Sequence, residues 1–136
     1  MQRPQRLDTE LTIVLATLGA LLTVFLGLLG ALAPHRAAHL VGIKPLGGFG
    51  TSEIRATYGG LFLAMGGSCL YLQHPTAYFV VASAWIGAAI ARLPSLIIDK
   101  GSFPKAIGGV VVKLGIGLLL LTGAQLNIRT LDTVFR

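Results

Sequence analysis

Four long apolar blocks constrain this chain more than any other feature of its sequence. A helix needs about 20 apolar residues to cross the hydrocarbon core of a bilayer. Backbone groups inside lipid must form their hydrogen bonds within their own segment, so apolar blocks of this length are expected to be helical. The pattern therefore predicts an all-α integral membrane protein. The blocks cover residues 11–33, 54–72, 77–98 and 104–126.

The connections between the blocks indicate how the helices are arranged. Residues 73–76 and 99–103 leave room only for short turns, and short turns make neighbouring helices antiparallel. Residues 34–50 form a longer connection, with a short interfacial helix expected near residues 34–41. We expect one domain over residues 1–136, an up-down four-helix bundle with both termini on one side of the membrane. Its helices are expected at about 9–33, 52–72, 76–98 and 104–126.

Composition supports a membrane protein and argues against nucleic acid as a partner. Hydrophobic residues make up 54% of the chain and charged residues 12%, with a mean hydropathy of +0.77. A soluble domain carries about 25% charged residues. The formal net charge of +6 comes from Arg and Lys residues that flank the apolar blocks, without a basic run. We therefore expect a lipid bilayer and no nucleic acid as a partner.

The first apolar block also allows a second interpretation. Ala31, Leu32 and Ala33 resemble a small-residue cleavage site, which would make the preceding residues a signal peptide. The apolar run is long for a signal peptide, and Pro34 would follow the cut directly. We therefore expect the first helix to remain part of the protein.

Small residues recur at four-residue spacing along the predicted helices. The chain contains 18 glycines among 136 residues, whereas glycine averages about 7% of residues in proteins. Small residues let helix backbones approach closely inside lipid. Two stripes are therefore candidates for packing within the bundle or for an interface with a partner or a second copy. They are Gly19, Thr23 and Gly27 on the first helix, and Ala56, Gly60 and Ala64 on the second.

Six polar residues interrupt the apolar blocks near one face of the membrane. A helix rises about 1.5 Å per residue, which places these residues at similar depth in one leaflet. Charged groups in hydrocarbon need partners. The cluster predicts either a polar pocket for an anionic group or a salt-bridge network in which Arg92 pairs with Glu53 or Asp99. The six are Glu53, Arg55, Tyr58, Arg92, Asp99 and Lys113.

Some members of this cluster also have simpler explanations. Glu53 follows two residues that are good N-caps, Thr51 and Ser52, and a carboxylate in the first turn complements the helix dipole. Lys113 could extend its long side chain toward the headgroups. Tyr58 lies one turn after Arg55, so these two can share a helix face.

The segment Glu53–Gly60, E-I-R-A-T-Y-G-G, resembles the signature of a bacterial four-helix inner-membrane family known as domain of unknown function 4345. In that family a similar E-x-R-x-x-Y-G-G opens the second helix, and an Arg in the third helix is followed by an Asp-Gly turn. The counterparts here are Arg92 and Asp99, with Lys100 inserted before Gly101. The resemblance implies a four-helix fold and a multi-pass location in the bacterial inner membrane. It implies no activity.

No motif for catalysis accompanies these features: the chain has no G-x-S-x-G, P-loop, CxxC or H-E-x-x-H. His35 and His39 have the spacing of metal ligands but lack a third ligand, so we expect neither a metal nor another cofactor. Two function classes remain. The sequence favours a small non-enzymatic accessory or scaffold subunit that packs against a larger membrane complex or against copies of itself. The alternative is a membrane protein whose polar cluster binds an anionic lipid, a fatty carboxylate or a quinone.

Overall fold

A computed structural model describes residues 3–94, 98 and 103–125 of the chain. Regular structure in these residues is helical throughout, without strands, so the predicted all-α class is confirmed. The helices are α1 (Arg3–Leu32), α2 (Pro34–Val41), α3 (Gly47–Ile54), the π-helix η1 (Arg55–Leu61), α4 (Phe62–Leu72), α5 (Pro75–Ile90) and α7 (Phe103–Ala124).

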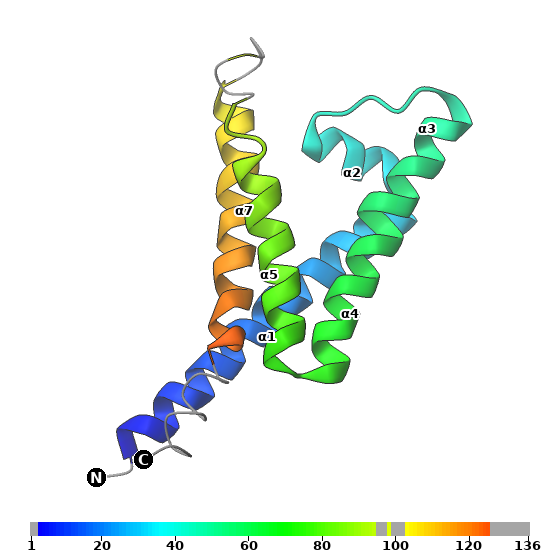
Figure 1. Cartoon of the computed structure of the whole chain (residues 1–136). Helices are drawn as coiled ribbons and strands as arrows, with labels where there is room; N and C mark the ends of the chain where they lie inside the picture. Colours follow the sequence, from blue (N-terminus) through cyan, green and yellow to red (C-terminus); the bar gives the residue numbers. More distant parts are fainter. Residues whose placement is uncertain (1–2, 95–97, 99–102, 126–136) are drawn as a thin grey trace.

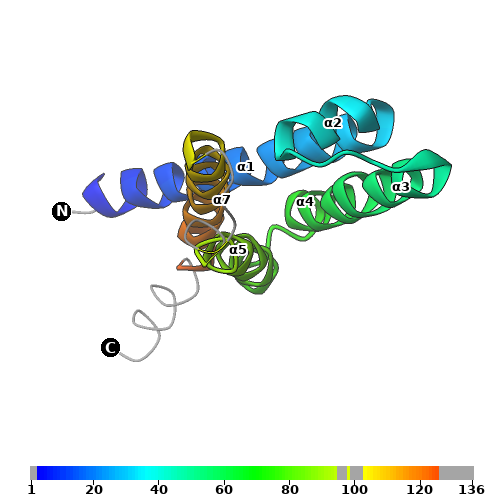
Figure 2. The ribbon, with the colours of Figure 1, turned by 90° about the horizontal axis from the view of Figure 1, so that it is seen from above.

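The long helices form two groups that meet at one end and diverge at the other (Figure 1). α5 and α7 run side by side, while α1 packs along η1 and α4. α1 also crosses α7, and the hydroxyl of Thr122 donates a hydrogen bond of 3.3 Å to the carbonyl of Thr12 there. Seen from above, α2 and α3 lie beyond this crossing, beside the distal part of α1 (Figure 2). The two groups therefore diverge on the side of the molecule where α2 and α3 lie.

The two groups meet at a core of small, aliphatic and aromatic side chains. Ala16 and Leu120 are fully buried there, as is Thr23. The hydroxyl of Thr23 donates to the carbonyl of Gly19 at 2.9 Å and accepts from the indole N–H of Trp85 at 3.1 Å. An unpaired indole donor inside this core would lose its hydrogen bond to water without replacement. The Thr23–Trp85 bond therefore ties α1 to α5 at the point where the groups meet.

The two predicted small-residue stripes have different surroundings. Gly19, Thr23 and Gly27 are buried and face other helices of the same chain. A β-carbon added at Gly19 would lie 3.0 Å from side-chain atoms of α7, and one at Gly27 would lie 2.7 Å from the backbone nitrogen of Leu63 in α4. The other stripe is exposed: Ala56, Gly60 and Ala64. The chain thus uses the first stripe for its own packing and leaves the second uncovered.

The second long helix begins earlier than its sequence predicts. α3, η1 and α4 follow one another without a break, so the helix starts at Gly47 and not at Ser52. Leu46 occupies the N-cap position without a side-chain hydrogen bond, and Thr51 bonds back to the carbonyl of Gly47 at 3.1 Å. The capping role expected for Thr51 and Ser52 is therefore wrong, and Glu53 lies beyond the first turn. Glycine in a helix costs about 1 kcal/mol per residue relative to alanine. The glycines at the start of α3 are nevertheless helical, because this turn continues directly into η1 and α4.

The third long helix ends earlier than predicted, at Ile90 instead of near residue 98. Proline lacks an N–H, and its ring conflicts with the carbonyl of the residue four positions earlier. For Pro94 that residue is Ile90. The N–H groups of Arg92 and Leu93 instead donate to carbonyls three residues back, at 3.1 and 3.0 Å. Pro94 therefore places Arg92 in a turn at the end of α5.

The short helix expected near residues 34–41 is present as α2, with Pro34 in its first turn. It ends at Gly42, whose φ of 77° is the left-handed conformation that glycine adopts most easily. Ala37 and Ala38 pack against Ile54 of α3. This contact holds α2 across the divergent end of the molecule.

Two helical segments are long and apolar enough to cross a membrane, judged by length and composition: Arg6–Leu32 and Ile107–Ala124. Pro75–Ile90 is apolar but shorter. Large apolar side chains are also exposed on the outer surface, such as Phe25 on α1 and Val111 on α7, each 61% exposed. Exposed apolar surface of this kind occurs at membrane contacts and at contacts with other proteins.

Candidate functional site

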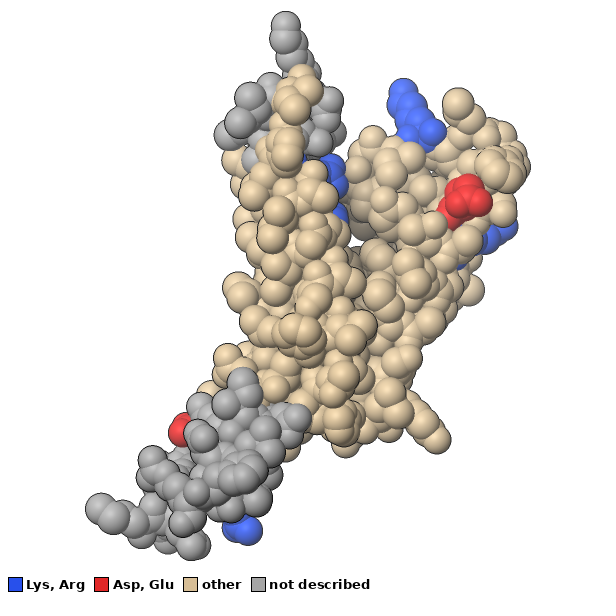
Figure 3. All heavy atoms as spheres, viewed as in Figure 1, with Lys and Arg blue, Asp and Glu red and all other residues tan. Residues whose placement is uncertain are grey.

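A cavity of about 400 Å³ lies at the divergent end, between the two groups of helices. Its wall is built from α1, α2, η1, α4, α5, the turn after α5, and α7. In the space-filling view, Lys or Arg atoms lie at the wall of the hollow between these groups (Figure 3). The volume falls within the range of roughly 300–1,000 Å³ that is typical of small-molecule sites.

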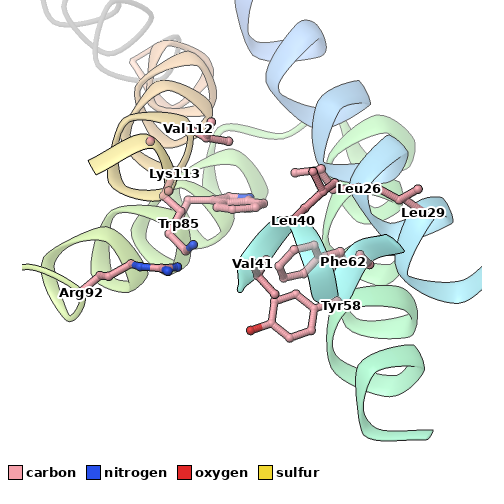
Figure 4. A pocket seen from close by; sticks show the side chains of 13 residues that line it. Leu26, Leu29, Leu40, Val41, Tyr58, Phe62, Trp85, Arg92, Val112 and Lys113 are labelled. Carbon is pink, nitrogen blue, oxygen red and sulfur yellow. The ribbon is translucent and has the colours of Figure 1, made fainter. Parts of the chain in front are cut away.

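Arg92 and Lys113 supply the charged groups of this wall. One comes from the turn after α5 and the other from α7, and both side chains point toward the same part of the cavity (Figure 4). Both residues are partly buried, and neither side chain has a hydrogen bond or an ion pair with any residue that the structure describes. Two like charges beside an apolar space repel each other. An anion placed between them would relieve that repulsion.

Gly109 allows the two cations to come together. A β-carbon added at Gly109 would lie 3.1 Å from Nη1 of Arg92. The guanidinium therefore lies close against the backbone of α7. Lys113 follows Gly109 by four residues, so both lie on the same face of that helix. A side chain at position 109 would therefore require the guanidinium of Arg92 to shift.

Aromatic side chains form another part of the wall. The ring centroids of Tyr58 and Phe62 lie 5.7 Å apart in an edge-to-face arrangement, and those of Phe62 and Trp85 lie 4.9 Å apart. In Figure 4, Tyr58 approaches from the side opposite Arg92 and Lys113, with its hydroxyl turned toward them. A phenol hydroxyl can donate a hydrogen bond to an anion held there. The cavity thus combines two cations and one neutral donor with aromatic and aliphatic surface.

Tyr58 lies in the π-helix η1, where the helix meets α1 at very short distance. A β-carbon added at Gly59 would lie 2.8 Å from the backbone nitrogen of Ala31, and one added at Gly30 would collide with the carbonyl of Tyr58. π-helical turns are rare and occur frequently at functional sites. The Y-G-G part of the sequence signature therefore packs η1 onto α1 and positions Tyr58 at the cavity.

The structure brings together half of the predicted polar cluster: Tyr58, Arg92 and Lys113 line the cavity. Glu53 and Arg55 are exposed and do not contribute to its wall. Arg92 forms no ion pair with Glu53. Asp99 lies outside the described residues, as does the Asp-Gly turn of the family resemblance. The spacing of Tyr58 and Arg55 allows them to share a helix face, but Tyr58 lines the cavity and Arg55 does not.

Other residues of the wall were not identified from the sequence. Leu26 of α1, Leu40 of α2 and Phe62 of α4 are ordinary apolar residues of predicted helices, and no sequence pattern distinguishes them. Trp85 both packs in the core and lines the cavity. The one signal in the sequence was Gly109, a glycine one helical turn before the lysine that interrupts the last apolar block.

Within the described residues, no group of three His, Cys, Asp or Glu side chains is close enough to hold a metal ion. His35 and His39 are exposed on α2. The cavity wall offers attraction of an anion by its two basic groups, hydrogen bonding by Tyr58, and apolar contact.

Comparison with known families agrees with the sequence signature. The model of a family described as Domain of unknown function (DUF4345) matches residues 11–124, from α1 to the end of α7. This range includes E-I-R-A-T-Y-G-G and the whole cavity wall. Neither the curated proteins nor the solved structures contain a match to the chain. The family suggested by the signature is confirmed, and the chain belongs to the DUF4345 family.

Proposed function

We propose that this protein is a multi-pass membrane protein that binds an amphiphile with an anionic head in the cavity. The observation that supports this most directly is the pair of basic groups, Arg92 and Lys113, beside an apolar space without an acidic partner among the described residues. A charge removed from water without a partner is costly. An anionic head with an apolar tail would satisfy both parts of the wall.

The proposed membrane arrangement has four spans: α1, the continuous helix from α3 to α4, α5, and α7. Both ends of the chain then lie on one side, and α2 lies at the opposite interface. Exposed apolar side chains on the outer helix faces support this arrangement. The family resemblance suggests the bacterial inner membrane as the location.

The binding function can be tested by titrating the purified protein in lipid nanodiscs with oleate. Trp85 is the single tryptophan of the chain and lines the cavity, so its fluorescence should report occupancy. Hydrogen bonds to charged groups contribute about 1.5–3 kcal/mol each. Arg92→Gln and Lys113→Gln should therefore each weaken oleate binding by roughly tenfold or more.

Arg36→Gln is the matched control for this titration, because Arg36 is an exposed basic residue of α2 that does not line the cavity. It should bind oleate as the unmodified protein does. Equal affinities for Arg36→Gln, Arg92→Gln and Lys113→Gln would contradict the proposed site. So would a Trp85 signal that oleate does not change.

A second candidate function is that of an accessory subunit of a larger membrane complex. The observation that favours it is the exposed stripe of Ala56, Gly60 and Ala64, which no described part of the chain covers. Stripes of this kind mediate close helix contacts in lipid. The same stripe could also join two copies of this chain.

Gly60→Leu tests this candidate, with Gly87→Leu as its control. A β-carbon added at Gly60 would have as its nearest neighbour the carbonyl oxygen of Arg55, 4.0 Å away on the same helix, and one added at Gly87 would have no atom within 4 Å. Neither substitution should therefore disturb the fold. If the stripe is an interface, Gly60→Leu alone should release a partner that purifies in fixed ratio with the protein in mild detergent. Retention of that partner by both variants would argue against the stripe.

A further inference from the structure

We infer that the ligand is a single-chain anionic amphiphile that enters the cavity sideways from the bilayer, through a portal between α2 and α7. The portal consists of Leu40 on α2, and Gly108 and Val112 on α7. This inference rests on the proposed binding function and adds the ligand's shape and its route.

The rim of the cavity is apolar on both of these helices. Leu40 is 70% exposed and Val112 is 52% exposed, and both line the cavity. Gly108, in the second turn of α7, is also exposed, and a β-carbon added there would have no atom within 4 Å. A mouth that opens to water would expose this apolar surface unfavourably, whereas a mouth that opens to acyl chains would not. The rim therefore fits access from lipid.

α2 separates the cavity from the aqueous side in the proposed membrane arrangement. Its cavity side carries Ala37, Leu40 and Val41, while Arg36 and His39 are exposed. Such an amphipathic helix lies in the membrane interface with its apolar side toward the hydrocarbon. A ligand coming directly from water would have to pass this helix. A ligand in the bilayer would instead meet the exposed apolar residues of the rim, Leu40 on α2 and Val112 on α7.

The distribution of groups along the wall suits one chain with one acidic head. Arg92, Lys113 and Tyr58 line the same cavity, and guanidinium, ammonium and phenol all donate to anionic oxygens, which fits one carboxylate or phosphate head. Leu26 and Leu29 of α1 provide apolar surface for a tail. The volume of about 400 Å³ is near the low end of small-molecule sites, which fits one chain.

The portal can be tested by the kinetics of oleate binding in nanodiscs, followed by the fluorescence of Trp85 after rapid mixing. Gly108→Leu places a side chain in the portal, and Leu40→Phe narrows it from the opposite rim. Gly115→Leu is the matched control: it lies two turns further on nearly the same face of α7, is exposed, does not line the cavity, and has the same open space. All three variants should keep the thermal stability of the unmodified protein within a few degrees.

The expected result is that Gly108→Leu and Leu40→Phe each slow both association and release of oleate by roughly tenfold. Gly115→Leu should change neither rate. Unchanged rates in both portal variants, with oleate still bound, would overturn the lateral route but leave the binding function standing. A slower association without a slower release would also overturn it, since a portal affects both directions.

Four probes test the ligand class in the same assay. Oleate and an oleoyl lysophosphatidate carry one chain and an anionic head, oleyl alcohol lacks the charge, and dioleoylphosphatidylglycerol carries two chains. Binding of either single-chain anion, with at least tenfold weaker binding of the other two, supports the inference, and the stronger of the two anions identifies the head as carboxylate or phosphate. Equal binding of the two-chain lipid would overturn the single-chain assignment. Binding of none of the four would overturn the proposed function itself.

Discussion

Arg92 and Lys113 show how single residues of this chain depend on their local backbone. Arg92 lies in a turn because Pro94 ends α5 at Ile90, and its guanidinium fits against α7 because position 109 is a glycine. Lys113 has a long side chain that could reach the headgroups, yet it lines the cavity together with Arg92. Each cation is thus positioned by a neighbour with an unusual backbone property, a proline in one case and a glycine in the other.

The buried hydrogen bond between Thr23 and Trp85 leads to a prediction about stability. In the unmodified protein the indole nitrogen of Trp85 lies 3.1 Å from the hydroxyl oxygen of Thr23. Thr23→Val keeps the shape of the side chain but leaves this indole N–H without an acceptor. Hydrogen bonds between membrane helices contribute about 0.6 to 2 kcal/mol. We expect Thr23→Val to lower the free energy of unfolding by about 1–2 kcal/mol, measured by denaturant titration in detergent micelles. Thr76→Val, at an exposed position, should change it little; equal losses in the two variants would contradict this role.

Helix packing in this molecule depends on where glycines lie along each element. α1 approaches η1 and α4 through Gly27 and Gly30, while α7 approaches α5 through Gly117, where an added β-carbon would lie 2.7 Å from Ile86. Small residues at these points let the backbones approach closely, so that van der Waals contact between them contributes to holding the helices together. Glycines elsewhere on the same helices, such as Gly67, face open space.

This difference between glycines gives a prediction at the scale of the element. Gly30→Ala should separate α1 from η1, because its methyl group would collide with the backbone of Tyr58. We expect a loss of about 1–3 kcal/mol in stability, as for other overpacked positions, together with weaker oleate binding. Gly67→Ala should be neutral or slightly stabilising, since alanine has the higher helix propensity. Thermal unfolding of both variants measures the effect, and a stable Gly30→Ala would show that α1 and η1 do not approach so closely.

The molecule as a whole consists of two groups of helices held together at one end. The core around Thr23 and Trp85 joins them, and the cavity lies where they diverge. α2 is positioned against this end by the buried contact of Ala37 and Ala38 with Ile54. Because the cavity wall comes from both groups, a change in the angle between them would change its width without unfolding either group.

The proposed four-span arrangement predicts which positions share a side of the membrane. In a Cys69→Ala background, single cysteines at the exposed positions Arg6, Gln73 and Gln125 should react with a membrane-impermeant thiol reagent from one side. A cysteine at Lys44 should react only from the other side. Permeabilised membranes, in which all four positions should react, provide the control. Reaction of positions 6 and 44 from the same side would exclude the four-span arrangement.

Part of the candidate site could be predicted from the sequence, because charge inside an apolar block is a local signal. Arg92, Lys113 and Tyr58 were identified in this way, and all three line the cavity. Glu53 and Arg55 carried the same signal but are exposed. Residues three apart share a face in an α-helix, but η1 is a π-helix with i→i+5 bonds, so its residues at that spacing point in different directions.

The sequence by itself determined the all-α class, the family, the short helix after Pro34 and the presence of apolar helices. These properties depend on hydropathy, length and motif, which are all local. Only the tertiary structure decided that the first glycine stripe is internal, that η1 adopts a π-helix against α1, and that the two helix groups diverge around a cavity. The physical reason is that these features depend on how each helix is rotated about its axis and how closely it approaches its neighbours. Rotation and approach are set by contacts between residues far apart in the chain, such as Thr23 with Trp85 and Gly109 with Arg92.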